Sequence, residues 1–288
     1  PSLEPYKMPM IFAVIAFLTY GNLRGVKEAG KAFAFPTYFF VGCMFIVFGM
    51  GLYRLANGTL PVLDTNLPGA VPLGQEQGLL TFAAIFILLR AFANGGSSLT
   101  GLEAISDGVA LFKTPEHVNA KRTLVIMSTL LGILVLGVSY FAHHIYAMPY
   151  ENGVPTVISQ IAKAAVGTGG FGTFMFIMVQ AATMLILFAG ANTTYSAFPI
   201  LVNFVASDGF LPRQLTKRGH RLAFSNGILL LAGGGLFLVI ITAGSVEHLV
   251  AFYALGVFTG FTLAGFGMTR YYLRKKPDGW RLKVFING

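Results

Sequence analysis

The sequence predicts an all-α polytopic membrane protein, and three observations lead to that fold class. Hydrophobic residues make up 55% of the 288 residues, charged residues only 11%, and the mean hydropathy is +0.71. Because an ordinary soluble domain carries about 25% charged residues, this chain has too few charges to cover a water-exposed surface. Apolar runs of spanning length recur along the chain, and basic residues gather in every second connection between them.

Seven apolar segments are predicted to be spanning helices of one transmembrane domain that covers residues 1–288. A spanning helix needs roughly 20 apolar residues, so the first segment is short and the fifth is long enough to continue beyond the bilayer. The absence of an initiator Met and the abrupt ends favour an internal fragment of a longer membrane protein. The segments are about 8–21, 37–55, 79–112 with an interruption at 94–101, 123–147, 171–204, 224–243 and 249–272.

Basic residues set the predicted orientation of these spans. Sixteen of the 20 lie in the connections after the first, third, fifth and seventh spans, whereas the alternate connections hold only Lys7, Arg54 and Lys163. Connections rich in Lys and Arg remain in the cytoplasm, so the N-terminus is predicted outside. The net charge of +9 is then a topology signal, and we expect no nucleic-acid partner. Residues 148–170 form an outer connection with a short helix expected near 155–166.

The third span contains the strongest functional signal. Three glycines and three hydroxyl residues lie within residues 94–101, and each helical glycine costs about 1 kcal/mol relative to alanine. An unwound stretch inside a membrane offers carbonyl oxygens to a cation or amide groups to an anion. Close helix packing through small residues is the alternative. The predicted substrate- or ion-binding residues are Gly95, Gly96, Ser97, Ser98, Thr100 and Gly101.

Three charged residues lie beside this interruption. Glu103 and Asp107 are four residues apart, on one face of the predicted second half-helix, and Arg90 lies about one turn before the interruption. Charges inside a membrane are costly and often mark an ion, proton or substrate path. We therefore expect these three residues to be coupling or pathway residues. Ion pairing with Arg90, helix capping and exposure to cytoplasmic water are the structural alternatives.

Polar residues in two later spans complete the candidate site. Asn192, Thr193 and Thr194 form a small polar patch in the fifth span, and Tyr253 lies near the outer end of the seventh. The patch is predicted to line the pathway, although hydroxyl groups also bond to their own helix backbone. Tyr253 faces either the binding cavity or the membrane interface.

The sequence favours no enzymatic role and no cofactor. It contains no P-loop, no dinucleotide-binding glycine motif and no serine nucleophile elbow. Its single cysteine, Cys43, excludes a disulfide scaffold and a cysteine zinc site.

Three stretches of the chain resemble the amino acid–polyamine–organocation superfamily. Residues 22–30, Asn-Leu-Arg-Gly-Val-Lys-Glu-Ala-Gly, are similar to the loop between the fourth and fifth helices of that superfamily, and Asp208-Gly-Phe-Leu-Pro212 is similar to the loop after the eighth. The interruption at 94–101 then matches the unwound sixth helix, so the chain covers helices four to ten. The resemblance implies a LeuT-like fold of two inverted five-helix repeats.

Within this superfamily, residues 96–106, Gly-Ser-Ser-Leu-Thr-Gly-Leu-Glu-Ala-Ile-Ser, resemble the KimA-type potassium importers, a branch related to the Kup transporters. That resemblance implies proton-coupled import of K⁺ across a bacterial plasma membrane, by a multi-pass protein embedded in the lipid bilayer. It also implies that Thr100 and Tyr253 contact K⁺, Tyr253 by position only. Thr100 is then the one residue expected to hold a metal ion, namely the transported K⁺.

Two other functions stay open at this point. An amino acid permease would keep the fold and bind the substrate carboxylate at glycine amides and a half-helix terminus. A polytopic receptor or scaffold would also have several spans, but the interrupted third span and the 35 glycines argue against it. Assembly as a homodimer is left open as well.

Overall fold

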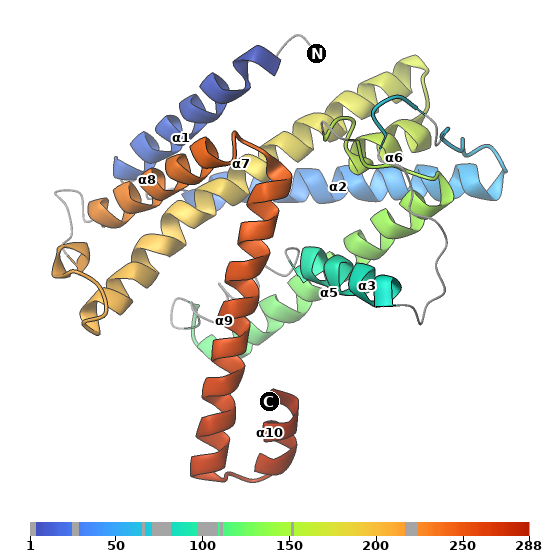
Figure 1. The fold of residues 1–288 in the computed structure, drawn as a ribbon. Helices are drawn as coiled ribbons and strands as arrows, with labels where there is room; N and C mark the ends of the chain where they lie inside the picture. The colour runs from blue at the N-terminus through green and yellow to red at the C-terminus, as the bar shows by residue number, and fades with distance from the viewer. Residues whose placement is uncertain are drawn as a thin grey trace. The chain divides into compact units, whose positions relative to one another are not determined.

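The computed structural model describes residues 4–24, 29–64, 67–70, 82–96, 109, 112–150, 153–216 and 224–287. Throughout these ranges the regular structure is helical, and no strand is present apart from one isolated antiparallel bridge between Ala70 and Tyr150. This agrees with the predicted all-α class. Figure 1 shows the helices in chain order.

Nine α-helices and two 3₁₀ helices are described within those ranges. They are η1 (Glu4–Tyr6), α1 (Lys7–Leu23), α2 (Ala29–Ala56), α3 (Phe82–Gly96), α5 (Glu116–His144), α6 (Val157–Val166), α7 (Gly170–Ser207), η4 (Arg213–Thr216), α8 (Ser225–Ile241), α9 (Val246–Lys275) and α10 (Trp280–Asn287). The short helix expected near 155–166 corresponds to α6. Helix α10 was not predicted.

Four of the described helices are long and apolar enough to cross a membrane. Their candidate spanning segments are Ala34–Ala56 in α2, Glu116–His144 in α5, Gly170–Ser207 in α7 and His248–Lys275 in α9. Helix α7 has 38 residues, which correspond to about 57 Å at 1.5 Å per residue. Since the hydrocarbon core is about 30 Å thick, α7 is long enough to leave it. Helices α1 and α8, with 17 residues each, are apolar but shorter.

Helix α3 extends into the interruption that was predicted for the third span. Asn94, Gly95 and Gly96, assigned above to the interruption, form the last described turn of α3. The remaining residues of the interruption, 97–101, lie outside the described residues.

The chain divides into two compact units. One comprises Pro1–Gly74 and Val125–Ala243, and the other comprises Gln75–Leu124 and Gly244–Gly288. In the first unit, α7 packs against α2, α6 and α8, and α1 packs against α8 and α7. In the second unit, α9 packs against α3 and α10.

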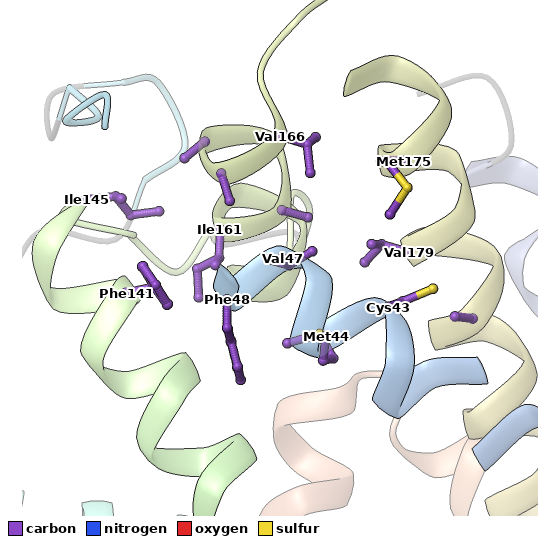
Figure 2. Packing of buried hydrophobic residues seen from close by; sticks show 14 residues of the cluster. Cys43, Met44, Val47, Phe48, Phe141, Ile145, Ile161, Val166, Met175 and Val179 are labelled. Carbon is purple, nitrogen blue, oxygen red and sulfur yellow. The ribbon is translucent and has the colours of Figure 1, made fainter. Parts of the chain in front are cut away.

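The main hydrophobic core of the first unit joins α2, α5, α6 and α7. Met44 and Val47 of α2, Ile145 after α5, Ile161 of α6 and Val179 of α7 are the largest side chains that are fully buried. Figure 2 shows these residues converging between the four helices. This core gives the first unit a fixed helical frame.

Two glycine–phenylalanine contacts hold α2 against α5. A Cβ atom at Gly137 of α5 would lie 2.4 Å from Phe48 Cε2, and one at Gly51 of α2 would lie 2.6 Å from Phe141 Cε1. The two rings stack on each other, with centroids 5.6 Å apart and an interplanar angle of 19°. Each helix therefore supplies one glycine and one ring, and each ring occupies the space above the partner's glycine.

We expect Gly137→Ala to destabilise the protein. The buried Phe48 ring is stacked and has little room to move, so overpacking should cost about 1–3 kcal/mol, more than the gain of about 1 kcal/mol in helix propensity. The thermal transition of the detergent-solubilised full-length protein measures this change. Gly132→Ala in the same helix is the control, because a Cβ at Gly132 meets nothing within 4 Å. Equal stability of the two variants would contradict the packing argument.

Helix α6 is fixed at both ends by side-chain hydrogen bonds. At its start, the Thr156 hydroxyl accepts a bond from the Ser159 amide (3.2 Å), and the Gln160 side chain bonds the amide and carbonyl groups of Met148 (3.1 and 2.7 Å). At its end, Arg54 Nη1 donates to the Ala164 carbonyl (3.0 Å). Helix ends leave such carbonyls unpaired, so Arg54 satisfies one of them.

Candidate functional site

The end of α3 and the middle of α9 form the described part of the predicted binding region. A Cβ atom at Gly96 would lie 2.9 Å from Phe258 Cζ, so the absence of a side chain at Gly96 is what admits the phenylalanine ring. Phe92, one turn earlier in α3, lies 5.8 Å from Phe258 between ring centroids, and Phe261 lies 6.5 Å away in an edge-to-face arrangement. The Phe258 ring therefore covers the last described turn of α3.

Tyr253, the candidate residue of the seventh predicted span, lies on α9, the helix that packs against α3. It lies five residues before Phe258, with 36% of its surface exposed. Gly95 is exposed and Gly96 is buried. Gly95, Gly96 and Tyr253 thus belong to two helices that pack against each other.

The other predicted residues of the third span are not described. Ser97, Ser98, Thr100, Gly101, Glu103 and Asp107 lie outside the described residues, and Arg90 lies on α3 with only its backbone described. Their predicted roles in binding or coupling stay predictions.

In the first unit, two polar pairs connect α1 to α7. Asn22 Nδ2 donates to Asn192 Oδ1 (2.8 Å) and also to the Leu18 carbonyl (2.9 Å). Beside it, the hydroxyl oxygens of Thr19 and Tyr195 are 3.1 Å apart. Asn192 and Tyr195 are buried, so both make their helix-to-helix bonds away from solvent.

The hydroxyl neighbours of Asn192 behave differently. Thr193 is exposed and donates to the Gly190 carbonyl of its own helix (2.7 Å), and Thr194 is exposed as well. The sequence pattern predicted a functional role for Asn192 but not for its partner Asn22 or for the pair formed by Thr19 and Tyr195. The three-residue spacing of positions 19 and 22, and of 192 and 195, places the two residues of each helix on one face, but it does not indicate which helix lies opposite.

We expect Asn192→Leu to lower stability without changing the KM for the substrate. Removing the amide oxygen breaks an interhelical bond, and such bonds in membranes contribute about 0.6 kcal/mol on average and up to about 1.7 kcal/mol. Thermal unfolding and uptake kinetics of the full-length protein measure the two effects. Thr193→Val is the control, since Thr193 bonds only within its own helix among the described contacts. An altered KM in Asn192→Leu would instead make Asn192 a pathway residue.

Two cavities in the first unit differ in their chemistry. One, of about 780 Å³, lies between α1 and α8 and is apolar apart from the hydroxyl groups of Thr19 and Tyr20. The other, of about 650 Å³, lies beside α6 and includes Arg54 and Lys163 in its wall. Two cationic side chains repel a cation, so the cavity beside α6 does not suit K⁺. Among the described residues, no group of three or more metal-ligating side chains gathers either.

Comparison with known proteins places the chain in a transporter family. The family model for amino acid permeases matches residues 4–287. The chain is also 39% identical, over 289 aligned residues, to a protein described as the potassium transporter KimA of Bacillus subtilis (strain 168). That alignment covers 100% of this chain and 45% of the relative, so the chain spans less than half of the relative's length. Since the family model covers almost the whole chain, the protein belongs to the amino acid permease family of the amino acid–polyamine–organocation superfamily, a family of membrane-embedded transporters and not of enzymes.

Proposed function

We propose that the full-length protein is a secondary transporter that imports K⁺ together with protons across the plasma membrane. The observation that carries this proposal is the 39% identity, along the whole chain, to a protein described as a potassium transporter. The run at residues 96–106, which resembles KimA-type importers, points to the same substrate.

The direction of α3 favours a cation at the predicted interruption. A helix carries partial negative charge at its C-terminal end, and its last four carbonyl groups lack partners within the helix. Gly95 and Gly96 form that end of the described helix. If the chain unwinds beyond Gly96, as the sequence predicts, these carbonyl groups face the ion together with the Thr100 hydroxyl. A substrate carboxylate would meet the unfavourable pole of α3.

The proposed architecture is a LeuT-like inverted repeat in which this chain supplies helices four to ten. Seven described helices, α1, α2, α3, α5, α7, α8 and α9, overlap the seven predicted spans in sequence, which supports a multi-pass arrangement. In this arrangement α9 is the tenth helix, and Tyr253 contributes to K⁺ binding from it.

The description of the family favours a second candidate function, the uptake of amino acids. The matching family model is that of amino acid permeases. The N-terminus of the predicted second half-helix would then bind the substrate carboxylate.

Rescue of growth distinguishes the two substrates. The full-length protein should restore growth of a bacterium lacking its own K⁺ uptake systems at micromolar K⁺. Its K⁺ uptake should increase as the external pH falls and stop with a protonophore, because protons drive the import. Failure of rescue by protein verified in the membrane, together with uptake of a radiolabelled amino acid, would replace K⁺ with the amino acid.

Glu103 is the proposed proton carrier in this scheme, since a membrane carboxylate can bind and release a proton during transport. Glu103→Gln should remove the increase in uptake at low pH. Asp208→Asn is the control, because Asp208 lies in an exposed turn after α7. An unchanged pH profile in Glu103→Gln would exclude Glu103 as the carrier.

A further inference from the structure

The hairpin formed by α9 and α10 concentrates positive charge at its tip. Helix α9 ends at Lys275, and the chain turns through residues 276–279 with positive φ angles at Lys276 and Gly279. Helix α10 then folds back beside α9, so that a Cβ atom at Gly265 would lie 2.8 Å from the Asn287 carbonyl oxygen. Six basic residues and one acidic residue, Asp278, lie between positions 270 and 288; the basic ones are Arg270, Arg274, Lys275, Lys276, Arg281 and Lys283.

The side chains of α10 form a face toward α9, an exposed apolar ridge on the opposite side, and two cations that flank the ridge. Successive helical residues are rotated by about 100°, which places Trp280, Val284 and Asn287 on one face. These three are half-buried, as expected for the face against α9. The opposite face presents an apolar ridge of Leu282, Phe285 and Ile286, which are 65%, 84% and 70% exposed.

Cations border this ridge on both sides. By the same rotation, Arg281 lies along one edge of the ridge and Lys283 lies along the other, and both side chains are exposed. Because α10 folds back along α9 from the turn, the ridge extends from the turn toward the acyl region, and the long side chains of Arg281 and Lys283 can place their charges at the phosphates.

Aromatic rings hold several of these cations in place. Lys276 Nζ and Arg281 Cζ lie 5.7 and 5.6 Å from the centre of the Trp280 ring, and Lys283 Nζ lies 5.6 Å from that of Tyr272. Trp280 is the only tryptophan of the chain, and tryptophan and tyrosine are enriched at membrane interfaces. The cationic groups are therefore positioned at the tip of the hairpin beside the end of a helix long enough to span the membrane.

From this arrangement we infer that the α9–α10 hairpin is a binding surface for the headgroups of anionic phospholipids, in the leaflet that the sequence predicts to be cytoplasmic. Exposed cations beside a spanning helix attract acidic lipids, and the ridge of Leu282, Phe285 and Ile286 enters the acyl region next to them. Charge alone would also suit a nucleic acid, but a nucleic acid offers nothing to cover an apolar ridge of this kind.

Lipid binding by the purified full-length protein tests this inference independently of transport. Native mass spectrometry counts the molecules of phosphatidylglycerol or phosphatidylcholine, with matched acyl chains, that remain bound at increasing lipid concentration. The wild type should prefer phosphatidylglycerol. Lys276→Gln/Arg281→Gln/Lys283→Gln should weaken that binding by about tenfold or more, since each basic residue near an anionic surface strengthens binding several-fold.

Two matched variants separate this site from general electrostatics. Lys113→Gln/Lys121→Gln/Arg122→Gln removes the same charge from exposed positions in and before α5 and should change binding less than about twofold. The charge-retaining variant Lys276→Arg/Arg281→Lys/Lys283→Arg should bind like the wild type, which also confirms folding of the hairpin. Equal losses in the two glutamine triples, no preference of the wild type for phosphatidylglycerol, or displacement of the lipid by equimolar inorganic phosphate would overturn the inference.

Discussion

Adding one methyl group at Gly96 should reduce K⁺ uptake by the full-length protein by roughly 5- to 150-fold. The methyl would lie 2.9 Å from Phe258 Cζ, and the ring has neighbours at Phe92 and Phe261. Overpacking of this kind costs about 1–3 kcal/mol. If this cost raises the free energy of the α3–α9 arrangement that transports K⁺, the population of that arrangement falls by roughly 5- to 150-fold. Initial rates of K⁺ uptake by Gly96→Ala measure the effect.

A compensating variant identifies the cause. Phe258→Leu removes the ring atoms that the new methyl would meet, so Gly96→Ala/Phe258→Leu should recover most of the lost rate, and the double-mutant cycle should show strong coupling. Gly260→Ala in α9, where a Cβ meets nothing within 4 Å, should transport normally. A double variant no better than Gly96→Ala would show that the methyl acts on α3 itself and not through Phe258.

Thr100→Ala should raise the apparent KM for K⁺ by roughly 10- to 150-fold while expression holds. If the Thr100 hydroxyl binds the ion, its removal deletes a polar contact to a charged group, and such contacts contribute about 1.5–3 kcal/mol. Thr100→Ser retains the hydroxyl and should stay within a few-fold of the wild type. Uptake rates across a range of K⁺ concentrations give both values.

Thr259 offers a matched control for this substitution. It lies on α9 and its hydroxyl donates to the Leu255 carbonyl of its own helix (2.7 Å), so Thr259→Ala should leave the KM unchanged. Equal KM increases in Thr100→Ala and Thr100→Ser would mean that the shape of the side chain matters and that the oxygen does not bind the ion.

Local signals were sufficient to predict most of the helices but not their partners. The apolar runs predicted the all-α class, and Pro and Gly around residues 148–170 located α6. Asn22 and Asn192 are 170 residues apart, and nothing local to either position indicates the other. The low helix propensity of glycine also led to an interruption predicted from Asn94, whereas α3 is described through Gly96. Helix propensity does not include tertiary contacts such as the packing of the Phe258 ring on Gly96.

Helix α10 was missed for a related reason. Its basic residues, Arg281 and Lys283, continue the run of basic residues that follows the seventh predicted span, so the sequence pattern predicts a cytoplasmic connection there. The packing of Trp280, Val284 and Asn287 against α9 explains the helix, and it depends on a turn whose geometry the sequence pattern does not reveal.

The stacked rings between α2 and α5 have an evolutionary consequence. Each ring fills the space above a glycine of the opposite helix, so a larger residue at position 137 is tolerated only when the residue at position 48 becomes smaller, and the same holds for positions 51 and 141. Among relatives of this protein, each pair should therefore change together, whereas Gly132 and Gly49, which face open space, should vary without any such partner.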